Sequence, residues 1–178
     1  MSYSMNKTKF LSSQEYERLA TTLDKFELKD FRNVALIYAM MHTGARPSEL
    51  LAVTTGDLNE EGKSVFIRGL KGSRDREIPL PPKVFARLIQ VAAQNYVLNG
   101  CKDERVFPIA LRTLQGIWHQ YRPSKKGIKS LRHTFAIRLY QKTKDVRLVQ
   151  MALGHKSMSN TQVYVEYLYS LEEMKRIL

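Results

Sequence analysis

The sequence has 178 residues, 43% of them hydrophobic, which suffices for one folded domain with its own core and argues against a disordered chain. Its 29 Lys and Arg residues outnumber 17 Asp and Glu residues, and the formal net charge of +12 favours a polyanionic partner. A single cysteine, Cys101, excludes an internal disulfide and a Cys-based zinc site, and favours a reducing compartment. We find neither a signal-peptide pattern nor an apolar run long enough to cross a bilayer, and we expect a cytoplasmic protein with no membrane partner.

The positive charge is concentrated in one part of the chain. Residues 121–147 hold nine basic residues and a single acid, whereas residues 1–30 hold five of each. Within the basic segment, Lys129, Arg132 and His133 have the spacing that places side chains on one side of a helix, and the opposite side carries an apolar stripe. Such a helix would present fixed hydrogen-bond donors to an anionic group such as a phosphate.

Local signals place helices along the first fifty residues. Ser12 and Glu15 form a capping box, which predicts a helix over residues 13–24. A second helix should begin near residue 28 and end at Gly44, because glycine is favoured at helix C-termini. Arg46 precedes a proline, which is favoured in the first helical position, so Arg46 should lie at a helix start.

A hydrophobic period of two then predicts a β-hairpin. Residues 65–68 have the pattern of one strand and residues 76–79 that of its return, with a basic tip over residues 71–75. A proline pair ends the sheet, and the helix that follows should run to about Gly100.

The remaining chain is predicted to be helical, with a basic loop over residues 122–127 and an amphipathic tail over residues 168–178. Asp145 should cap a short helix that ends at Gly154. We expect helices over residues 108–121, 129–140, 146–153 and 161–167. The predicted fold class is mainly α with a small antiparallel β-sheet, that is, α+β.

Most common catalytic patterns are missing from the sequence. It has no Ser-His-Asp order, glycine-rich phosphate loop or paired carboxylates, which disfavours hydrolases and kinases. Its four histidines are scattered and none has a second ligand at metal-binding spacing, so we expect no metal site. What remains is a set of basic residues at turns and helix ends, together with nine tyrosines that could act as nucleophiles.

Four short segments stand out along the chain. They are Thr43-Gly-Ala-Arg46-Pro-Ser-Glu49-Leu-Leu, Leu131-Arg132-His-Thr-Phe-Ala, Leu153-Gly-His155 and Thr161-Gln-Val-Tyr164. In this order and spacing the chain resembles, over roughly residues 10–178, the catalytic domain of the tyrosine recombinases, the phage integrase family. Four segments in matching order are far more specific than one short motif.

The resemblance implies a role for each matched residue. Arg46 and Arg132 would clamp the scissile phosphate, and Tyr164 would be the nucleophile. Lys71, at the hairpin tip, would protonate the leaving 5′ oxygen, and His155 would hydrogen-bond the phosphate. These residue types suit the chemistry, because two guanidinium groups can neutralise the charge that develops on a phosphate attacked by a phenol.

One position departs from the family pattern. Lys129 occupies the place where the family usually has a histidine, three residues before the second arginine. A lysine keeps a positive charge and a donor but cannot readily accept a proton near neutral pH. Lys129 should therefore stabilise negative charge rather than act as a base. Glu49 should help to hold the site in shape, and His133 is interpreted as a structural neighbour of the site.

Several assignments have competitors. Tyr167 and Tyr169 follow Tyr164 in the same segment, and the position of Tyr164 nine residues after His155 favours it as the nucleophile. The hairpin carries other basic residues besides Lys71, and any of them could simply bind the phosphate backbone. The predicted DNA-backbone contacts are Arg68, Arg74, Arg76, Lys125 and Lys126.

The resemblance implies a site-specific recombinase that cleaves and rejoins double-stranded DNA through a 3′-phosphotyrosyl intermediate, with no metal, ATP or other cofactor. It also implies a homotetramer on DNA with exchange of the C-terminal tail, and a location at the nucleoid. We expect residues 1–10 to be an N-terminal extension and residues 11–178 to be the catalytic domain, without the core-binding domain of larger members. Such a chain would be a minimal recombinase or a catalytic fragment of a longer integrase.

Two alternatives stay open. A related strand-passing topoisomerase would use the same chemistry to relax supercoils. A DNA-binding regulator with a disabled site would be consistent with the departure at Lys129.

Overall fold

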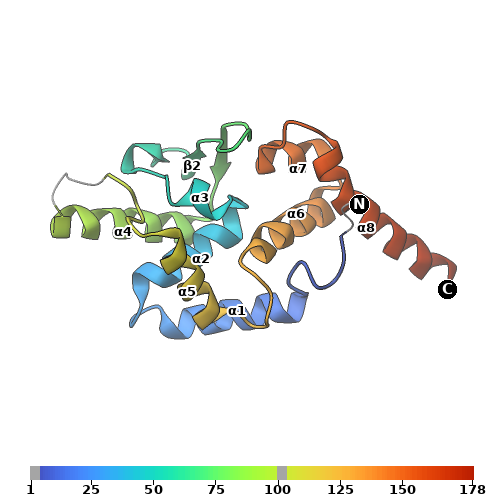
Figure 1. Cartoon of the computed structure of the whole chain (residues 1–178), viewed down its shortest axis with the longest axis horizontal. Coiled ribbons are helices and arrows are strands. Elements are labelled where there is room, and N and C mark those ends of the chain that lie inside the picture. The colour runs from blue at the N-terminus through green and yellow to red at the C-terminus, as the bar shows by residue number, and fades with distance from the viewer. Residues whose placement is uncertain (1–4, 100–103) are drawn as a thin grey trace.

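The computed structural model describes residues 5–99 and 104–178, and it is mainly helical with one small antiparallel sheet, as predicted (Figure 1). Cys101 and the predicted helix end at Gly100 lie outside the described residues. Among the residues described, no helix has the length and apolarity that crossing a membrane requires.

The capping and glycine signals place the start of helix α1 (Ser13–Phe26) and the end of helix α2 (Phe31–Thr43) correctly, whereas α1 ends at Phe26 instead of residue 24 and α2 begins at Phe31 instead of near residue 28. Helix α1 starts with the Ser12–Glu15 capping box. Helix α2 ends at Gly44, whose φ of 59° is left-handed and where any side chain would collide with the ring of Phe135. Helix α3 (Pro47–Leu50) begins with its proline in the first turn.

The hairpin is part of a three-stranded antiparallel sheet with the order β1-β2-β3. Strand β2 (Ser64–Ile67) pairs with β3 (Arg76–Pro79), and Ile67 lies opposite Arg76. A short 3-10 helix, η1 (Thr55–Asp57), leads into β1 (Leu58–Asn59), and neither was predicted. A two-residue strand is too short to show a period, which explains the omission.

The other helices are α4 (Pro82–Asn99), α5 (Leu111–Tyr121), α6 (Lys129–Thr143), α7 (Val146–Leu153) and α8 (Ser159–Ile177). The prediction of a short last helix followed by a separate tail is wrong, because residues 159–177 form one continuous helix. This stretch contains neither glycine nor proline, so nothing in it interrupts the helix.

Two groups of buried apolar side chains hold the molecule together. The first cluster packs α1, α2, α4 and α5 around the sheet, with Leu36, Leu88 and Trp118 among its fully buried members. The second cluster is smaller and joins α6, α7 and α8 through Ile137, Val149 and other residues. Helix α6 contributes to both clusters, so it connects the two parts of the core.

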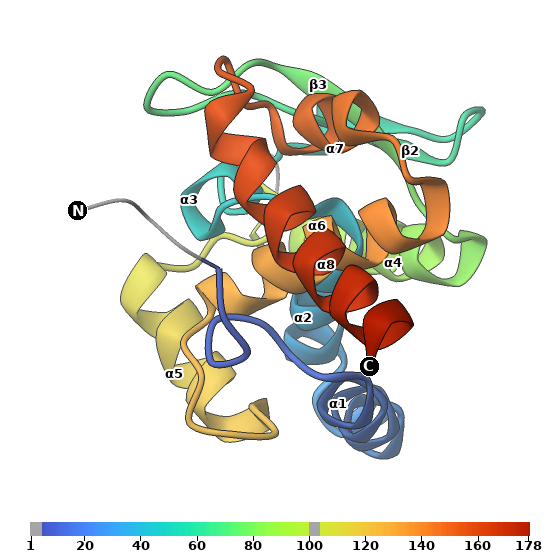
Figure 2. The same cartoon turned by 90° about the vertical axis from the view of Figure 1, so that its right-hand side faces the viewer.

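The segment before α1 also packs on the second cluster. Met5 is buried there, and the ring of Phe10 meets that of Tyr167 edge-on at 5.3 Å between centroids. The amide of Leu11 donates to Thr134 Oγ1 over 2.8 Å. The described part of the predicted extension, residues 5–10, is therefore packed against the domain. Helix α8 crosses this face in Figure 2, and its C-terminal end extends beyond the rest of the molecule in Figure 1.

Candidate active site

Arg132 lies between the C-terminal ends of two helices. Its Nη1 donates to the carbonyl of Gly44 at the end of α2 over 2.8 Å, and its Nη2 donates to the carbonyl of Leu153 at the end of α7 over 2.9 Å. The partial negative charge of both helix ends favours a cation at this place. Burial, together with Arg46 and Arg76, lowers the pKa of Arg132 to about 10, which still leaves it charged at neutral pH. Arg132 is thus a fixed, buried cation.

His155 follows Gly154, which ends α7, and contacts the same guanidinium. Its Nε2 lies 3.0 Å from Arg132 Nη2, and its Nδ1 lies 2.8 Å from Thr161 Oγ1. Because an arginine can only donate, Nε2 must be the acceptor and Nδ1 must carry the proton. Burial and the charge of Arg132 lower the pKa of His155 to about 4, in agreement with a neutral ring. The predicted contact of His155 with a phosphate stays a prediction.

Glu49 is the buried carboxylate around which the basic residues gather. Its Oε2 accepts from the Arg46 amide over 2.9 Å and from Arg76 Nη2 over 2.7 Å. Its Oε1 accepts from Arg46 Nη1 and from Ser73 Oγ, both over 2.8 Å. Burial alone would raise the pKa of Glu49, but the Arg46 amide and Arg76 outweigh burial and hold it at about 2. Glu49 is therefore ionised and bonds Arg46 and Arg76.

The hairpin tip that carries Lys71 is tied to the rest of the site. Ser73 bonds both Arg46 and Glu49, and the Arg74 amide donates to the carbonyl of Gly154 over 2.9 Å. Lys71 itself is exposed and has a left-handed φ of 53°. We define the Glu49 network as Glu49, Arg46, Ser73, Arg76 and Arg132. Lys71 is two residues from this network, on a loop that the network anchors.

Arg76 is not available for the DNA contact predicted for it. It is 7% exposed; its Nη2 bonds Glu49, and its Nε donates to the carbonyl of Ala152 over 2.8 Å. The guanidinium therefore joins strand β3 to α7 and neutralises Glu49. Strand alternation could have indicated this role, since Arg76 and the buried Ile78 are two residues apart and share a face.

Tyr164 lies on α8 and is 3% exposed, within the second cluster. His133 Nδ1 lies 2.9 Å from its hydroxyl, and the two rings are 5.8 Å apart. The structure thus places the predicted nucleophile against His133, the residue that follows Arg132 on α6, a contact that sequence reasoning missed.

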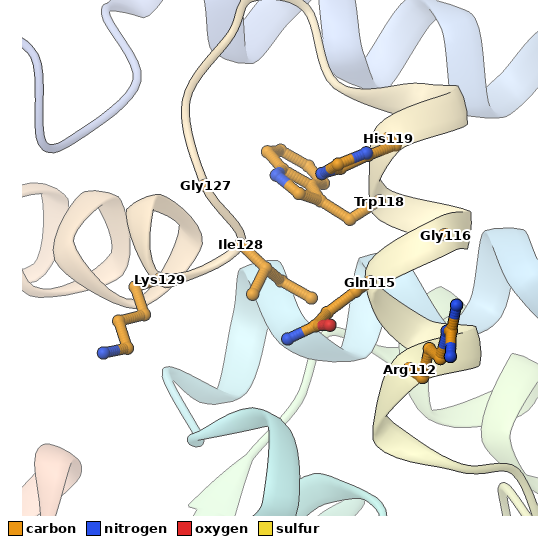
Figure 3. A pocket seen from close by; sticks show the side chains of 8 residues that line it. All are labelled: Arg112, Gln115, Gly116, Trp118, His119, Gly127, Ile128 and Lys129. Atoms are coloured by element: carbon orange, nitrogen blue, oxygen red, sulfur yellow. The ribbon is translucent and has the colours of Figure 1, made fainter.

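Lys129 is the first residue of α6 and is exposed. It borders an open hollow of about 740 Å³ between α5 and the start of α6, shown in Figure 3. Arg112, Gln115 and His119 of α5 line the same hollow. The start of α6 therefore faces a basic, accessible surface.

The other predicted DNA contacts differ in availability. Arg74 and Lys125 are exposed. Arg68 pairs with Asp57 over 2.5 Å but keeps 53% of its side chain exposed. Lys126 is bound to Glu15 over 2.6 Å, with 18% of its side chain exposed. Arg74 and Lys125 are exposed to a phosphate backbone, and Arg68 is exposed but would have to share its bond to the buried Asp57, whereas Lys126 and Arg76 are engaged within the protein.

The arrangement suits chemistry on a phosphodiester. Arg46 keeps 35% of its side chain exposed beside the buried Arg132, so two guanidinium groups converge near the surface. Charge-assisted hydrogen bonds from fixed guanidinium groups stabilise a phosphate that gains negative charge. Among the described residues, no three His, Cys, Asp or Glu side chains are grouped as metal ligands.

Comparison with known proteins gives a consistent result. The model of the phage integrase family matches residues 9–170. The chain is 31% identical over 173 residues to the tyrosine recombinase XerH of Campylobacter jejuni, a match that covers 89% of this chain and 48% of that protein. It is also 31% identical over 165 residues to the tyrosine recombinase XerA of Pyrococcus furiosus, with 88% of this chain and 56% of that protein covered. The chain thus spans about half the length of these relatives.

Solved structures show the same fold. One is a post-cleavage complex of the XerH site-specific recombinase bound to a palindromic difH substrate. The match covers 97% of this chain and 54% of the XerH chain, with a TM-score of 0.77 and 29% identity. For the pre-cleavage complex of XerH with difH, the match covers 92% of this chain and 52% of the XerH chain, with a TM-score of 0.72 and 28% identity. For the structure of the XerA recombinase, the match covers 96% of this chain and 66% of the XerA chain with a TM-score of 0.74. At 21% identity this match supports the fold alone.

Proposed function

The chain belongs to the phage integrase family, and from this premise we propose that it is the catalytic part of a tyrosine recombinase. It cleaves and rejoins DNA strands at specific sites through a covalent 3′-phosphotyrosyl intermediate. The observation that carries the proposal is that Arg132, held by two helix ends and linked to the Glu49 network, is followed on α6 by His133, whose ring contacts the hydroxyl of Tyr164 on α8.

The proposed reaction assigns one task to each group. Arg46 and Arg132 bind the non-bridging oxygens of the scissile phosphate and neutralise the charge that develops on them. Tyr164 attacks the phosphorus, and Lys71 protonates the 5′ oxygen that leaves. His155 would donate a hydrogen bond to the phosphate once DNA binding frees an N–H of its ring from its present partners, Arg132 and Thr161.

The covalent intermediate explains how strands are exchanged without an external energy source. The new ester between Tyr164 and the 3′ phosphate replaces the broken phosphodiester, so the bond energy is retained. The free 5′ hydroxyl of a second strand can then attack the ester and release the tyrosine. We therefore propose that ATP takes no part. We also propose that no metal ion takes part, because the two arginines supply the positive charge at the phosphate.

Double-stranded DNA is the proposed partner, which would place the protein at the nucleoid. The net charge of +12 and the exposed Arg68, Arg74 and Lys125 support this partner. XerH, which is similar over most of this chain, was captured with its DNA substrate before and after cleavage.

We also propose that the C-terminal end of α8 packs on a neighbouring protomer in a homotetramer. This end extends away from the domain, and Met174 and Leu178 are exposed there (Figure 1). Apolar side chains on a protruding helix favour association with another copy. The catalytic unit would then comprise residues 11–178 together with the packed arm at residues 5–10.

A nicked suicide substrate tests the proposed function, because loss of a short strand traps the covalent intermediate. We expect a protein–DNA adduct that forms in the presence of a metal chelator and disappears in Tyr164→Phe. Tyr167→Phe is the matched control, since it removes a hydroxyl from the same helix, and it should keep the adduct.

Other outcomes would favour the alternatives. Firm DNA binding without an adduct on any nicked substrate would indicate a DNA-binding regulator, an alternative that is consistent with the departure from the family pattern at Lys129. Relaxation of supercoils without exchange between two sites would indicate a topoisomerase.

A further inference from the structure

The hydroxyl of Tyr164 requires a proton acceptor, because a neutral phenol is a weak nucleophile. We propose that His133 Nδ1 accepts the proton of Tyr164 during strand cleavage and returns it during rejoining. This inference rests on the proposed function. It makes His133 a catalytic residue, since it contacts the reacting oxygen, instead of the structural neighbour expected from the sequence.

Geometry is the first support for this role. His133 Nδ1 lies 2.9 Å from the Tyr164 hydroxyl, within the range required of a general base. His133 follows Arg132 directly on α6, so one turn of one helix fixes both the proton acceptor and the phosphate clamp. Tyr164 is 3% exposed, which limits competition from water for its proton.

The surroundings of His133 keep its ring neutral. Arg132 and Lys129 face it from α6, Lys9 from the N-terminal arm and Tyr164 from α8. Burial first, and then these three cations, lower the pKa of His133 to about 4. A neutral imidazole has a nitrogen free of a proton, which can accept one at pH 7. The same cations stabilise the phenolate character that develops on Tyr164.

Because position 129 holds a lysine, the acceptor for the phenol proton must be another residue. An ammonium group has three donors and no lone pair, so Lys129 cannot take the phenol proton. His133 supplies that capacity one helical turn further along α6. Lys129 then contributes positive charge near the phosphate.

The proton and bond changes balance in each direction. During cleavage the Oη–H bond of Tyr164 breaks and an Nδ1–H bond forms on His133, while the Oη–P bond forms and the bond from phosphorus to the 5′ oxygen breaks. Lys71 gives a proton to that 5′ oxygen. During rejoining the 5′ hydroxyl returns a proton to Lys71, and the departing phenolate regains its proton from His133.

His133→Asn separates proton transfer from mere positioning. The Asn side chain keeps an acceptor near the place of Nδ1 but cannot take up a proton, whereas His133→Ala removes both capacities. Cleavage of the nicked substrate is measured in single turnover from pH 6 to pH 9. We expect both variants to cleave about 10²-fold more slowly than wild type at pH 7. Their rates should rise about tenfold per pH unit, because hydroxide must remove the proton, while the wild-type rate stays nearly flat.

His42→Asn is the matched control. His42 is also half-buried, lies on α2, and has its pKa lowered first by burial, but its ring stacks on Tyr38. Its rates and pH profile should follow those of wild type.

Two results for His133→Asn would overturn the proposal and leave His133 a positioning residue. One is a wild-type cleavage rate at every pH, and the other is a cleavage rate reduced by the same factor at every pH. Absence of an adduct in wild type would defeat the proposed function and this inference with it. If the His133 variants fail to fold, imidazole ¹⁵N NMR of wild type decides. We expect His133 to be neutral at pH 7 with its proton on Nε2, and a proton on Nδ1 would refute the inference.

Discussion

The arginines that would hold a phosphate and the tyrosine that would attack it lie on different parts of the core. Ala45 and Leu131, which precede Arg46 and Arg132, belong to the first cluster. The Glu49 network connects the start of α3 to β3, and its member Arg132 bonds the end of α2. Tyr164 belongs to the second cluster, which holds α8 and the N-terminal arm. The two parts meet at α6, where Arg132 bonds the end of α2 on one side and the end of α7 on the other, and His133 contacts Tyr164.

This difference separates two requirements of catalysis. Stabilisation of developing charge needs donors fixed before the reaction starts, and buried hydrogen bonds provide that rigidity. Delivery of a nucleophile to a strand, and its release afterwards, suits an element that is held by fewer interactions and can move. The four changes that follow test this division.

Arg132→Lys should have the largest effect. Lysine keeps the charge but cannot reach the carbonyls of Gly44 and Leu153 with a planar fork, so the clamp loses its fixed geometry. We expect cleavage of nicked DNA to slow by about 10²- to 10³-fold. Arg138→Lys is the control on the same helix, because Arg138 is exposed and stacks on Tyr16. Near-normal cleavage by Arg132→Lys would show that charge alone is sufficient.

Glu49→Gln should chiefly reduce stability, because it leaves buried arginines without their countercharge. The pKa of Glu49 is about 2 in the folded protein against an ordinary 4.5, so its ionised form favours folding above pH 4.5. The difference corresponds to about 3 kcal/mol at neutral pH.

Urea unfolding at several pH values measures this effect. The stability gap between wild type and Glu49→Gln should be full above pH 4.5 and shrink as the pH falls toward 2, where Glu49 takes up a proton. Glu77→Gln, at an exposed carboxylate of β3, should change stability little. A gap that does not depend on pH would contradict the assigned ionisation of Glu49.

Phe10→Ala should loosen the nucleophile side without altering the clamp. Phe10 packs edge-on against Tyr167 of α8, and such a pair contributes about 1 kcal/mol. We expect faster hydrogen exchange in α8 and unchanged exchange around Arg132. Phe26→Ala removes a similar edge-on contact, with Tyr121, from the first cluster. If it accelerated exchange in α8 equally, the two parts of the core would not be independent.

Lys129→His should have the smallest effect. It restores the residue usual in the family at an exposed position that makes no buried contact with the Glu49 network. We expect cleavage equal to or somewhat faster than wild type in the same single-turnover assay. A large loss would mean that Lys129 has a specific task that histidine cannot perform.

The sequence predicted the elements whose signals are local. The capping box at Ser12, the left-handed glycines at 44 and 154, and the proline after Arg46 each determine a helix end through the backbone of a few residues. The residues that share the site were placed by family resemblance, and the structure gathers Arg46, Glu49, Arg132 and His155 at one place.

Contacts between distant elements were not predictable in this way. His133 and Tyr164 lie 31 residues apart on two helices, and their contact depends on how α8 crosses α6. Arg76 is a predicted DNA contact as one of the basic residues of the hairpin, but the alternation of β3 places it on the buried face with Ile78. Residues 159–177 contain neither glycine nor proline, so α8 continues through the predicted boundary near residue 167.

Identification of the residue that becomes linked to DNA tests the central claim most directly. The wild-type adduct would be trapped on nicked DNA and digested with trypsin and nuclease, and its peptides would be sequenced by mass spectrometry. We predict a nucleotide remnant on Tyr164, within the peptide that follows Lys156. A remnant on Tyr167, Tyr169 or any other residue would contradict the account.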